Sequence, residues 1–295
     1  MTDAKLPGFQ ECFAESEGVR LRYFAAGEGE PLLLLHGLGG AASNWVETAP
    51  LLAARRRVVV PDLPGHGGSE PLADVPDLDV LADLIGELGD REGLWPGPVV
   101  GHSLGGTLGL RLAVRRPGDV TGLVLAAAAG ISSCTPGAAR AMTCVSLVRP
   151  ARFVVPFRGV IARRPLLRYV AFAWWGASDP PALSERATAG LLAAAAEQTD
   201  PWPTGRALVR HDPRLDLERV ACPCLVLWGA RDHWVPLRDG FEYARRLGAP
   251  LRAIAGCGHL LIAERPDVCV GAILEFLEPL QNDASPTGRD GRARG

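Results

Sequence analysis

Several features that would define other classes of protein are missing from this sequence. No apolar run is long enough to span a bilayer, and the opening residues, Met1–Gly8, hold no apolar core of a signal peptide. The formal net charge is only −2, so the chain has no overall attraction for nucleic acid. No internal repeat is evident. These absences predict a cytoplasmic protein that binds neither nucleic acid nor, stably, a membrane.

Cysteine is sparse, and its spacing suits neither a disulfide framework nor a metal site. The seven cysteines are an odd number, and a single proline separates Cys222 from Cys224, which is too close for a zinc or thioredoxin-like pair. Several cysteines lie in apolar runs, which indicates buried thiols in a reducing compartment. We therefore expect no metal and no organic cofactor.

The chain does have enough apolar sequence for one large core. With 295 residues and 47% hydrophobic content, it can bury a single α/β core and still carry an insertion. Short apolar runs alternate with helix-like segments, which predicts a mostly parallel, doubly wound sheet with helices on both faces. The expected strands, the first two forming a hairpin, are Phe9–Ala14, Val19–Ala25, Leu32–His36, Val58–Pro61, Val99–His102, Thr121–Ala126, Cys224–Trp228 and Leu251–Ile254.

Residues 133–212 interrupt this alternation of strands and helices. They contain arginine-rich and alanine-rich helical patterns and no strong strand, and their tryptophans are Trp174, Trp175 and Trp202. We interpret them as a helical cap inserted into an α/β core of residues 1–132 and 213–280. Residues 281–295 are polar and glycine-rich without periodicity, which predicts a disordered tail.

The sequence around Ser103 predicts a nucleophile on a forced turn. The segment Gly101–Gly105 (GHSLG) follows the apolar Pro98–Val100 and precedes the helix-like Thr107–Ala113. A strand that reverses at once into a helix crowds the backbone at its tip, and glycines two before and two after the serine relieve that crowding. The hydroxyl would then face outward at a helix N-terminus, which favours developing negative charge.

An activated serine also needs a base and a residue that orients the base. Asp232 follows the apolar run Cys224–Trp228, which reads as a buried strand, and His259 lies in the strand-to-helix loop after Leu251–Ala255. Both are therefore expected at the sheet edge that carries Ser103. The alternative place for the acid is residues 127–133, which contain no Asp or Glu. We therefore predict Ser103 as nucleophile, His259 as general base and Asp232 as the residue that orients it.

The same chemistry needs N–H donors for an oxyanion. The apolar run Leu32–Leu35 ends in His36–Gly40 (HGLGG), a flexible loop that can bring a backbone N–H to a substrate oxygen. Leu38 would give one donor and Leu104, directly after the serine, the other. Trp45, seven residues past Leu38, is a candidate wall of a substrate pocket, with a packed core aromatic as the alternative.

Taken together, these motifs resemble the α/β-hydrolase superfamily, in the chain order serine, acid, histidine. The resemblance runs from about residue 10 to about residue 280, and the middle of the chain is the least diagnostic part. A serine rather than an aspartate at the turn disfavours the relatives that open epoxides or displace halide. The matching motifs are His36-Gly37, the DLPGHGGS segment Asp62–Ser69, the Gly101–Gly105 turn, Gly229-x-x-Asp232-x-x-Val235-Pro236 and Gly258-His259.

The resemblance implies a serine hydrolase and leaves the cleaved bond open. Hydrolysis of a carboxylester or lactone with a small-to-medium acyl group is the first expectation. Hydrolysis of a carbon–carbon bond in a vinylogous diketone is the second, because such relatives share the triad and a helical cap. A non-catalytic ligand-binding protein on the same fold is a minor third. The oligomeric state stays open.

Charge is unevenly distributed within the expected cap. From Ile131 to Ser178 the chain has seven arginines and no Asp, Glu or Lys. A solvated helix face is one explanation, since long arginine stems cover apolar surface. The other is that one or two of them, Arg163 or Arg164, bind an anionic group of the substrate. The cap as a whole is expected to form much of the acyl pocket and to gate access to it.

Overall fold

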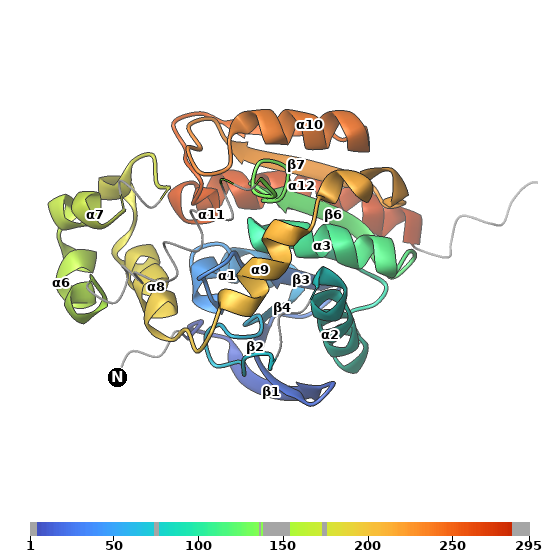
Figure 1. Cartoon of the computed structure of the whole chain (residues 1–295), viewed down its shortest axis with the longest axis horizontal. Coiled ribbons are helices and arrows are strands. Elements are labelled where there is room, and N and C mark those ends of the chain that lie inside the picture. The colour runs from blue at the N-terminus through green and yellow to red at the C-terminus, as the bar shows by residue number, and fades with distance from the viewer. Residues whose placement is uncertain (1–4, 74–76, 136, 138–153, 173–175, 285–295) are drawn as a thin grey trace, which may run out of the picture.

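The computed structural model describes residues 5–73, 77–135, 137, 154–172 and 176–284 (Figure 1). The strands among them are β1 (Gln10–Ser16), β2 (Val19–Ala26), β3 (Pro31–Leu35), β4 (Arg57–Pro61), β5 (Gly97–His102), β6 (Val120–Ala126), β7 (Cys224–Gly229) and β8 (Leu251–Ile254). The α-helices are α1 (Ala49–Ala53), α2 (Leu78–Arg91), α3 (Leu104–Arg115), α6 (Arg158–Arg163), α7 (Pro165–Phe172), α8 (Glu185–Ala196), α9 (Trp202–Arg210), α10 (Leu237–Leu247), α11 (Leu261–Glu264) and α12 (Pro266–Ala284). Short 3₁₀ helices are η1 (Ala42–Trp45), η2 (Val155–Phe157), η3 (Pro180–Ala182), η4 (Pro213–Leu215) and η5 (Leu217–Arg219).

The strands form one sheet in the order β1-β2-β4-β3-β5-β6-β7-β8. The β1–β2 hairpin joins the sheet through an antiparallel pairing of β2 with β4, and every later pairing is parallel. All eight strands expected from the apolar runs are present, with ends that differ by a few residues. The predicted mostly parallel α/β sheet is therefore confirmed.

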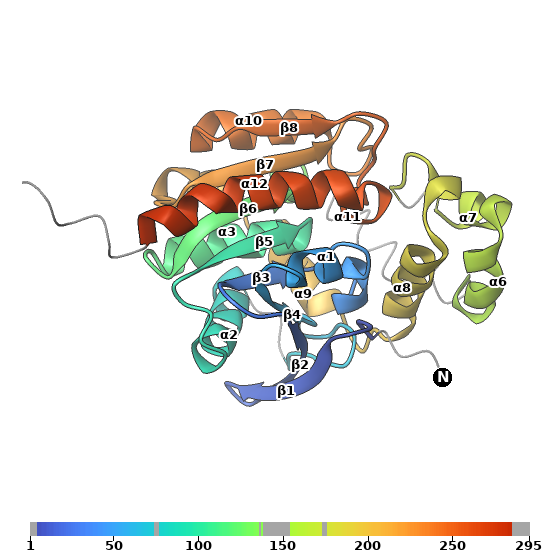
Figure 2. The ribbon, with the colours of Figure 1, turned by 180° about the vertical axis from the view of Figure 1, so that it is seen from behind.

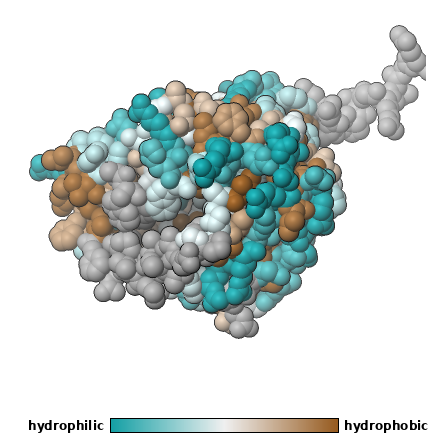
Figure 3. Space-filling view, turned by 45° about the horizontal axis from the view of Figure 1, so that its top comes forward, coloured by the Kyte–Doolittle hydropathy of each residue, from teal (hydrophilic) through white to brown (hydrophobic). Residues whose placement is uncertain are grey.

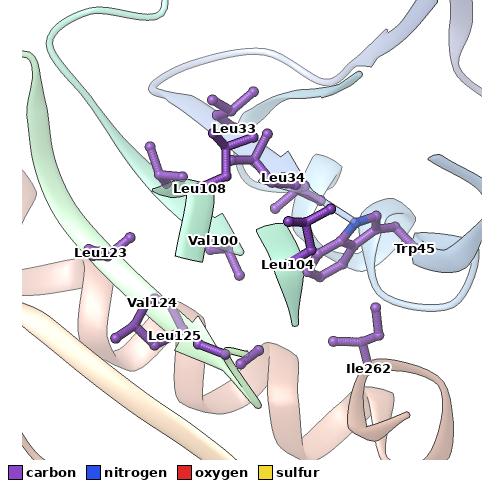
Figure 4. Close-up of a cluster of buried hydrophobic side chains, with 14 of the residues drawn as sticks. Leu33, Leu34, Trp45, Val100, Leu104, Leu108, Leu123, Val124, Leu125 and Ile262 are labelled. Carbon is purple, nitrogen blue, oxygen red and sulfur yellow. The ribbon is translucent and has the colours of Figure 1, made fainter. Parts of the chain in front are cut away.

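Helices cover both faces of the sheet, which explains why its inner strands are apolar without alternation. β5 and β7 are buried along their whole length. α3 and α10 pack on one face, and α12 packs on the other together with α1 (Figures 1 and 2). Side chains from β3, β5, β6 and α3 form the centre of the core (Figure 4). This packing makes the sheet a rigid platform for the loops at its edge.

The helices α6–α9, which lie between β6 and β7, stand where the sequence predicts an inserted helical segment. α6, α7 and α8 gather at one end of the molecule (Figures 1 and 2), and α8 packs against η1. The Ser43 hydroxyl donates to the Gly190 carbonyl of α8 at 2.9 Å, and a Cβ on Gly190 would lie 2.6 Å from the Ser43 carbonyl oxygen. Trp174 and Trp175 lie outside the described residues, whereas Trp202 begins α9.

The structure differs from the prediction at residues 281–284. α12 continues to Ala284, so residues 281–284 are helical, although they were expected in a disordered tail. The polar sequence of this last helical turn hid the continuation, because one turn is too short to show a period. Residues 285–295 lie outside the described part of the chain.

A buried ion pair fixes the loop that follows β4. Asp62 is fully buried and accepts from the Arg22 Nε at 2.6 Å, from the Ala42 N–H at 2.7 Å and from the Gly68 N–H at 2.9 Å. Arg22, on β2, also reaches the carboxylate of Glu197 at the end of α8, at 3.1 Å. The pair therefore holds β2, the loop after β4 and the end of α8 in one arrangement.

We expect Asp62→Ala to lower the free energy of unfolding by about 3–5 kcal/mol, because it leaves Arg22 buried without its main partner. The matched control is Asp83→Ala, which removes an Arg115 contact of 2.7 Å between partly exposed groups. That change should cost less than about 1 kcal/mol. Urea unfolding followed by circular dichroism measures both, and equal losses would contradict this account of the pair.

Candidate active site

Ser103 lies between β5 and α3 with its backbone in the left-handed region, at φ 54° and ψ −117°. This conformation is uncommon for a residue with a side chain and persists only where surrounding bonds hold it. The Ser103 N–H donates to the Ala126 carbonyl at 2.9 Å, and its carbonyl accepts from the Gly106 and Ala129 N–H groups at 3.0 and 3.1 Å. The turn is thus held from both β6 and α3.

Close backbone contacts require glycine at two places around this turn, and a third glycine lies against the side chain of the serine. A Cβ on Gly101 would lie 2.1 Å from the Gly105 carbonyl oxygen, and one on Gly105 would lie 2.3 Å from the Leu35 carbonyl oxygen. A Cβ on Gly37 would lie 3.0 Å from the Ser103 Cβ. The first two contacts explain the spacing of the GHSLG motif, and the third shows that the loop after β3 lies directly against the serine.

Ser103, His259 and Asp232 form one continuous chain of hydrogen bonds. The His259 Nε2 is 3.0 Å from the Ser103 Oγ, and its Nδ1 is 2.8 Å from the Asp232 Oδ2. The other oxygen of Asp232 accepts from the Trp234 and Val235 N–H groups at 2.8 and 2.9 Å. With both oxygens occupied, the carboxylate can turn in neither direction, so the imidazole it holds is fixed as well.

The loop that carries His259 is held by groups that the sequence did not single out. The His259 N–H donates to the Gly176 carbonyl at 2.7 Å. The carboxylate of Glu264 accepts from the Gly258 N–H at 3.1 Å and from the Ser178 N–H at 2.9 Å. Glu264 therefore ties the histidine loop to the chain that returns from α7, and burial raises its pKa although these N–H groups oppose the rise.

The loop after β3 is braced by two histidines. His36 Nδ1 binds the Gly37 carbonyl at 2.8 Å, and its Nε2 accepts from the Leu63 N–H at 2.9 Å. His66 accepts from the Gly39 N–H at 3.0 Å, while the Gln198 side chain donates to the Gly39 carbonyl. The two imidazoles therefore fix the course of the loop after β3.

This bracing leaves two N–H groups beside the serine without a protein acceptor. Among the residues that the structure describes, neither the Leu38 N–H nor the Leu104 N–H donates to a protein atom. Leu104 is the first residue of α3, where N–H groups have no partner within the helix. Such donors suit an oxygen that carries developing negative charge.

A cavity of about 170 Å³ opens onto Leu38 and Ser103. Its lining is mainly apolar, with contributions from the sheet-edge loops and from α7, α8 and α9. The lining residues are Gly37, Leu38, Gly39, Gly40, Asn44, His102, Ser103, Ala129, Ser133, Phe172, Leu191, Leu208, Trp234, Val235, His259 and Leu260.

Three candidate substrate-binding residues lie elsewhere. Trp45 is fully buried in the core cluster that contains Leu104 (Figure 4), because η1 turns its indole inward under the loop. Arg163 and Arg164 are exposed at the end of α6, whose buried side is formed by Ile161 and Ala162. None of the three lines the cavity. A pocket-wall role for Trp45 and direct contact of the two arginines with a substrate in this cavity are therefore not supported by the structure.

Two polar side chains of the lining were missed by sequence reasoning. The His102 Nε2–H donates to the His259 carbonyl, 2.8 Å away. Its Nδ1 and the Asn44 Oδ1 are buried and have no hydrogen-bond partner within the described chain. Both residues line the cavity, although these two atoms themselves are buried away from it.

Two further searches of the described residues give negative results. No group of three or more His, Cys, Asp or Glu side chains is arranged to hold a metal ion. No helix combines the length and the apolar character that crossing a membrane requires.

The fold, the turn at Ser103 and the order of the three polar residues define a class of protein. The chain belongs to the Alpha/beta hydrolase family, whose model matches residues 32–272. The predicted superfamily is therefore confirmed.

Three proteins with similar sequences have names that refer to different activities. The chain is 32% identical over 277 residues to the dihydrolipoyllysine-residue acetyltransferase component of the acetoin cleaving system of Pseudomonas putida, covering 90% of this chain and 68% of that protein. It is 35% identical to the pimeloyl-[acyl-carrier protein] methyl ester esterase of Aromatoleum aromaticum, with 81% and 94% covered. It is 28% identical to the 2-hydroxy-6-oxo-6-(2'-aminophenyl)hexa-2,4-dienoic acid hydrolase of Metapseudomonas resinovorans, with 91% of each chain covered.

The buried histidines make the stability of the site depend on pH. Burial lowers the pKa of His36 to about 4 and the pKa of His66 to about 3, from an ordinary 6.5. Below about pH 6.5 the unfolded chain therefore binds a proton at each of these two histidines, whereas the folded chain leaves them neutral. The stabilisation is complete above that pH and is lost as the pH falls toward the folded values.

We expect the free energy of unfolding to fall between about pH 7.5 and about pH 5, with each such histidine contributing about 2 kcal/mol of the decrease. His66→Gln should remove about that much of the pH dependence, whatever its effect at neutral pH. The control, His233→Gln, changes an exposed histidine and should keep the dependence. Urea titrations at the two pH values measure the free energy of unfolding. An equal decrease in that free energy for both variants would show that His66 does not couple folding to pH.

Proposed function

We propose that this protein is a serine hydrolase that cleaves a carboxylester or lactone with a small-to-medium acyl group. The observation that carries the proposal is the unbroken chain of hydrogen bonds from Asp232 through His259 to Ser103, which ends at an apolar cavity. A serine hydroxyl is a weak nucleophile until a base within hydrogen-bond reach removes its proton. At 3.0 Å, the His259 Nε2 is in position to do this.

In the first half of the reaction the Ser103 Oγ attacks the carbonyl carbon while His259 takes its proton. Asp232 stabilises the imidazolium that forms and keeps the imidazole in the tautomer that accepts at Nε2. The negative oxygen of the tetrahedral intermediate accepts from the Leu38 and Leu104 N–H groups. Removing one such donor typically costs about 2.7–4 kcal/mol of transition-state stabilisation. The intermediate then expels the alcohol, which receives its proton from His259.

In the second half, water attacks the acyl-enzyme. His259 takes a proton from the water and returns it to the Ser103 Oγ when the carboxylic acid leaves, which restores the starting state. No step requires a group other than the substrate, water and these side chains. The buried neighbours His36, His66 and His102 are held neutral by their lowered pKa values, so they add no charge near the reacting atoms.

The lining of the cavity supports an apolar acyl group of limited size. Phe172, Leu191 and Leu208 come from α7, α8 and α9, so we assign these helices the role of the cap, which would form the acyl pocket. The esterase relative that shares 35% of its residues with this chain supports the choice of bond.

Hydrolysis of a carbon–carbon bond is the second candidate. It is supported by the relative from Metapseudomonas resinovorans, whose likeness extends over 91% of both chains. The Ser103, His259 and Asp232 roles would be retained, and the leaving group would be a carbon acid in place of an alcohol. Substrate turnover distinguishes the two candidates.

The experiment is a panel of aryl esters of graded acyl length, each with and without a terminal carboxylate, with Ser103→Ala as the blank. We expect one length class to be turned over, and the variant to lose at least about 10⁴-fold in kcat. Because Arg163 and Arg164 lie outside the cavity, we expect no preference for the carboxylates. Absence of turnover across the panel, together with turnover of a vinylogous diketone, would reject the ester in favour of the carbon–carbon bond.

A further inference from the structure

Exposed apolar side chains are concentrated on two short helices. Of the 13 large hydrophobic side chains that are exposed in the described part of the chain, six lie between residues 157 and 170. They form what we call the α6–α7 apolar face, namely Phe157, Val160, Leu166, Leu167, Tyr169 and Val170. Apolar side chains are visible at this end of the molecule in Figure 3. A cluster of this kind on a folded protein marks an interaction surface.

The other side of the same helices is already packed. Ile161 of α6 and Phe172 of α7 belong to a buried cluster with Leu183 and Leu192, and Phe172 also lines the cavity. The helices are therefore anchored through one side while Leu166 and Val170 stay outside. The exposed side chains contribute little to this packing, so another role accounts for them.

Positive charge accompanies the apolar face. Arg158, Arg163, Arg164 and Arg168 lie within the same 14 residues, and the chain has no Asp, Glu or Lys from residue 131 to residue 178. Within the described residues none of the four pairs with a carboxylate, and the contacts of Arg158, Arg163 and Arg168 are to backbone carbonyls. These bonds orient the guanidinium groups and leave their charge uncompensated, so the partner should be anionic.

A second copy of the chain does not match this surface. A symmetric dimer would bring the same patch from each subunit together and would place eight arginines in one contact. α6 and α7 also protrude at one end of the molecule in both views (Figures 1 and 2). A protruding pair of helices can enter a deformable surface such as a lipid bilayer, whereas it would make limited contact with a flat protein surface.

We propose that the α6–α7 apolar face docks reversibly on an anionic lipid surface. Its apolar side chains would enter the boundary between headgroups and acyl chains, and the arginines would stay at the level of the phosphates. The contact is peripheral, so it requires no membrane-crossing helix. Phe172 of α7 and Ser103 line the same cavity. Docking through α7 would therefore bring lipophilic molecules of the lipid surface close to that cavity.

The test is sedimentation with vesicles of phosphatidylcholine alone and of phosphatidylcholine mixed with phosphatidylglycerol. We expect binding to the anionic vesicles, and a decrease of about tenfold or more with Leu166→Ser/Val170→Ser. The matched control, Leu215→Ser/Phe241→Ser, changes two equally exposed apolar residues on other elements and should bind as the unchanged protein does. Arg163→Gln/Arg164→Gln should weaken binding and its salt dependence, whereas Arg219→Gln/Arg238→Gln should not.

The docking does not depend on the proposed hydrolysis, and Ser103→Ala should bind the anionic vesicles unchanged. Thermal melts and turnover of a water-soluble aryl ester, both expected unchanged in Leu166→Ser/Val170→Ser, show that the variant is folded. No binding to anionic vesicles would overturn the proposal. Equal binding to vesicles of phosphatidylcholine alone would also overturn it. A dimer in sedimentation velocity that Leu166→Ser/Val170→Ser converts to monomer would overturn it as well, because the face would then bind a second copy of the chain.

Discussion

The site depends on the contact of three backbone segments at Ser103. The loop after β3, the end of β5 and the start of α3 approach one another more closely than side chains would allow, and Gly37, Gly101 and Gly105 make this approach possible. The serine itself keeps a left-handed backbone because hydrogen bonds from two neighbouring elements hold it. The place of its hydroxyl at the cavity follows from that close contact.

The helices between β6 and β7 are coupled to the site on two sides. On one side, Gln198 binds the carbonyl of Gly39 in the loop after β3, and Glu197 reaches the buried Arg22–Asp62 pair. On the other, Gly176 accepts from the His259 N–H. A displacement of this segment would therefore shift the loop after β3 and His259 together, so the helices that line the cavity also influence the surroundings of Ser103.

Most of the sheet and the hydrogen-bonded residues Ser103, His259 and Asp232 could be predicted from the sequence, because short stretches of residues indicate both. Strands β3 and β7 are short, largely apolar runs, and β5 is apolar at its centre. Ser103 follows β5, Asp232 follows β7, and His259 follows β8. The residues that were missed act over long distances in the chain. Glu264 binds Ser178, 86 positions away, and Gln198 binds Gly39 across 159 positions, so no window of sequence contains either pair.

The candidate pocket residues that do not line the cavity were placed by the same kind of local pattern. Spacing put Trp45 near the oxyanion loop, but which side its indole takes depends on the turn of η1 within the core. A run of arginines shows that a segment is positively charged, while the side on which Arg163 and Arg164 fall depends on which residues of α6 are buried. Composition also could not show that Phe172 would face the cavity and Val170 the solvent.

The central claim is that Ser103 is activated by His259 under the control of Asp232. The most direct measurement is the rate at which a fluorophosphonate labels the intact protein, with the modified residue located by peptide mass spectrometry. We expect one label, on Ser103, and a rate lower on the order of 10⁴-fold in Asp232→Asn, because the wrong tautomer of His259 cannot accept the serine proton. Labelling at another residue, or a rate in Asp232→Asn within tenfold of the unchanged protein, would contradict the account.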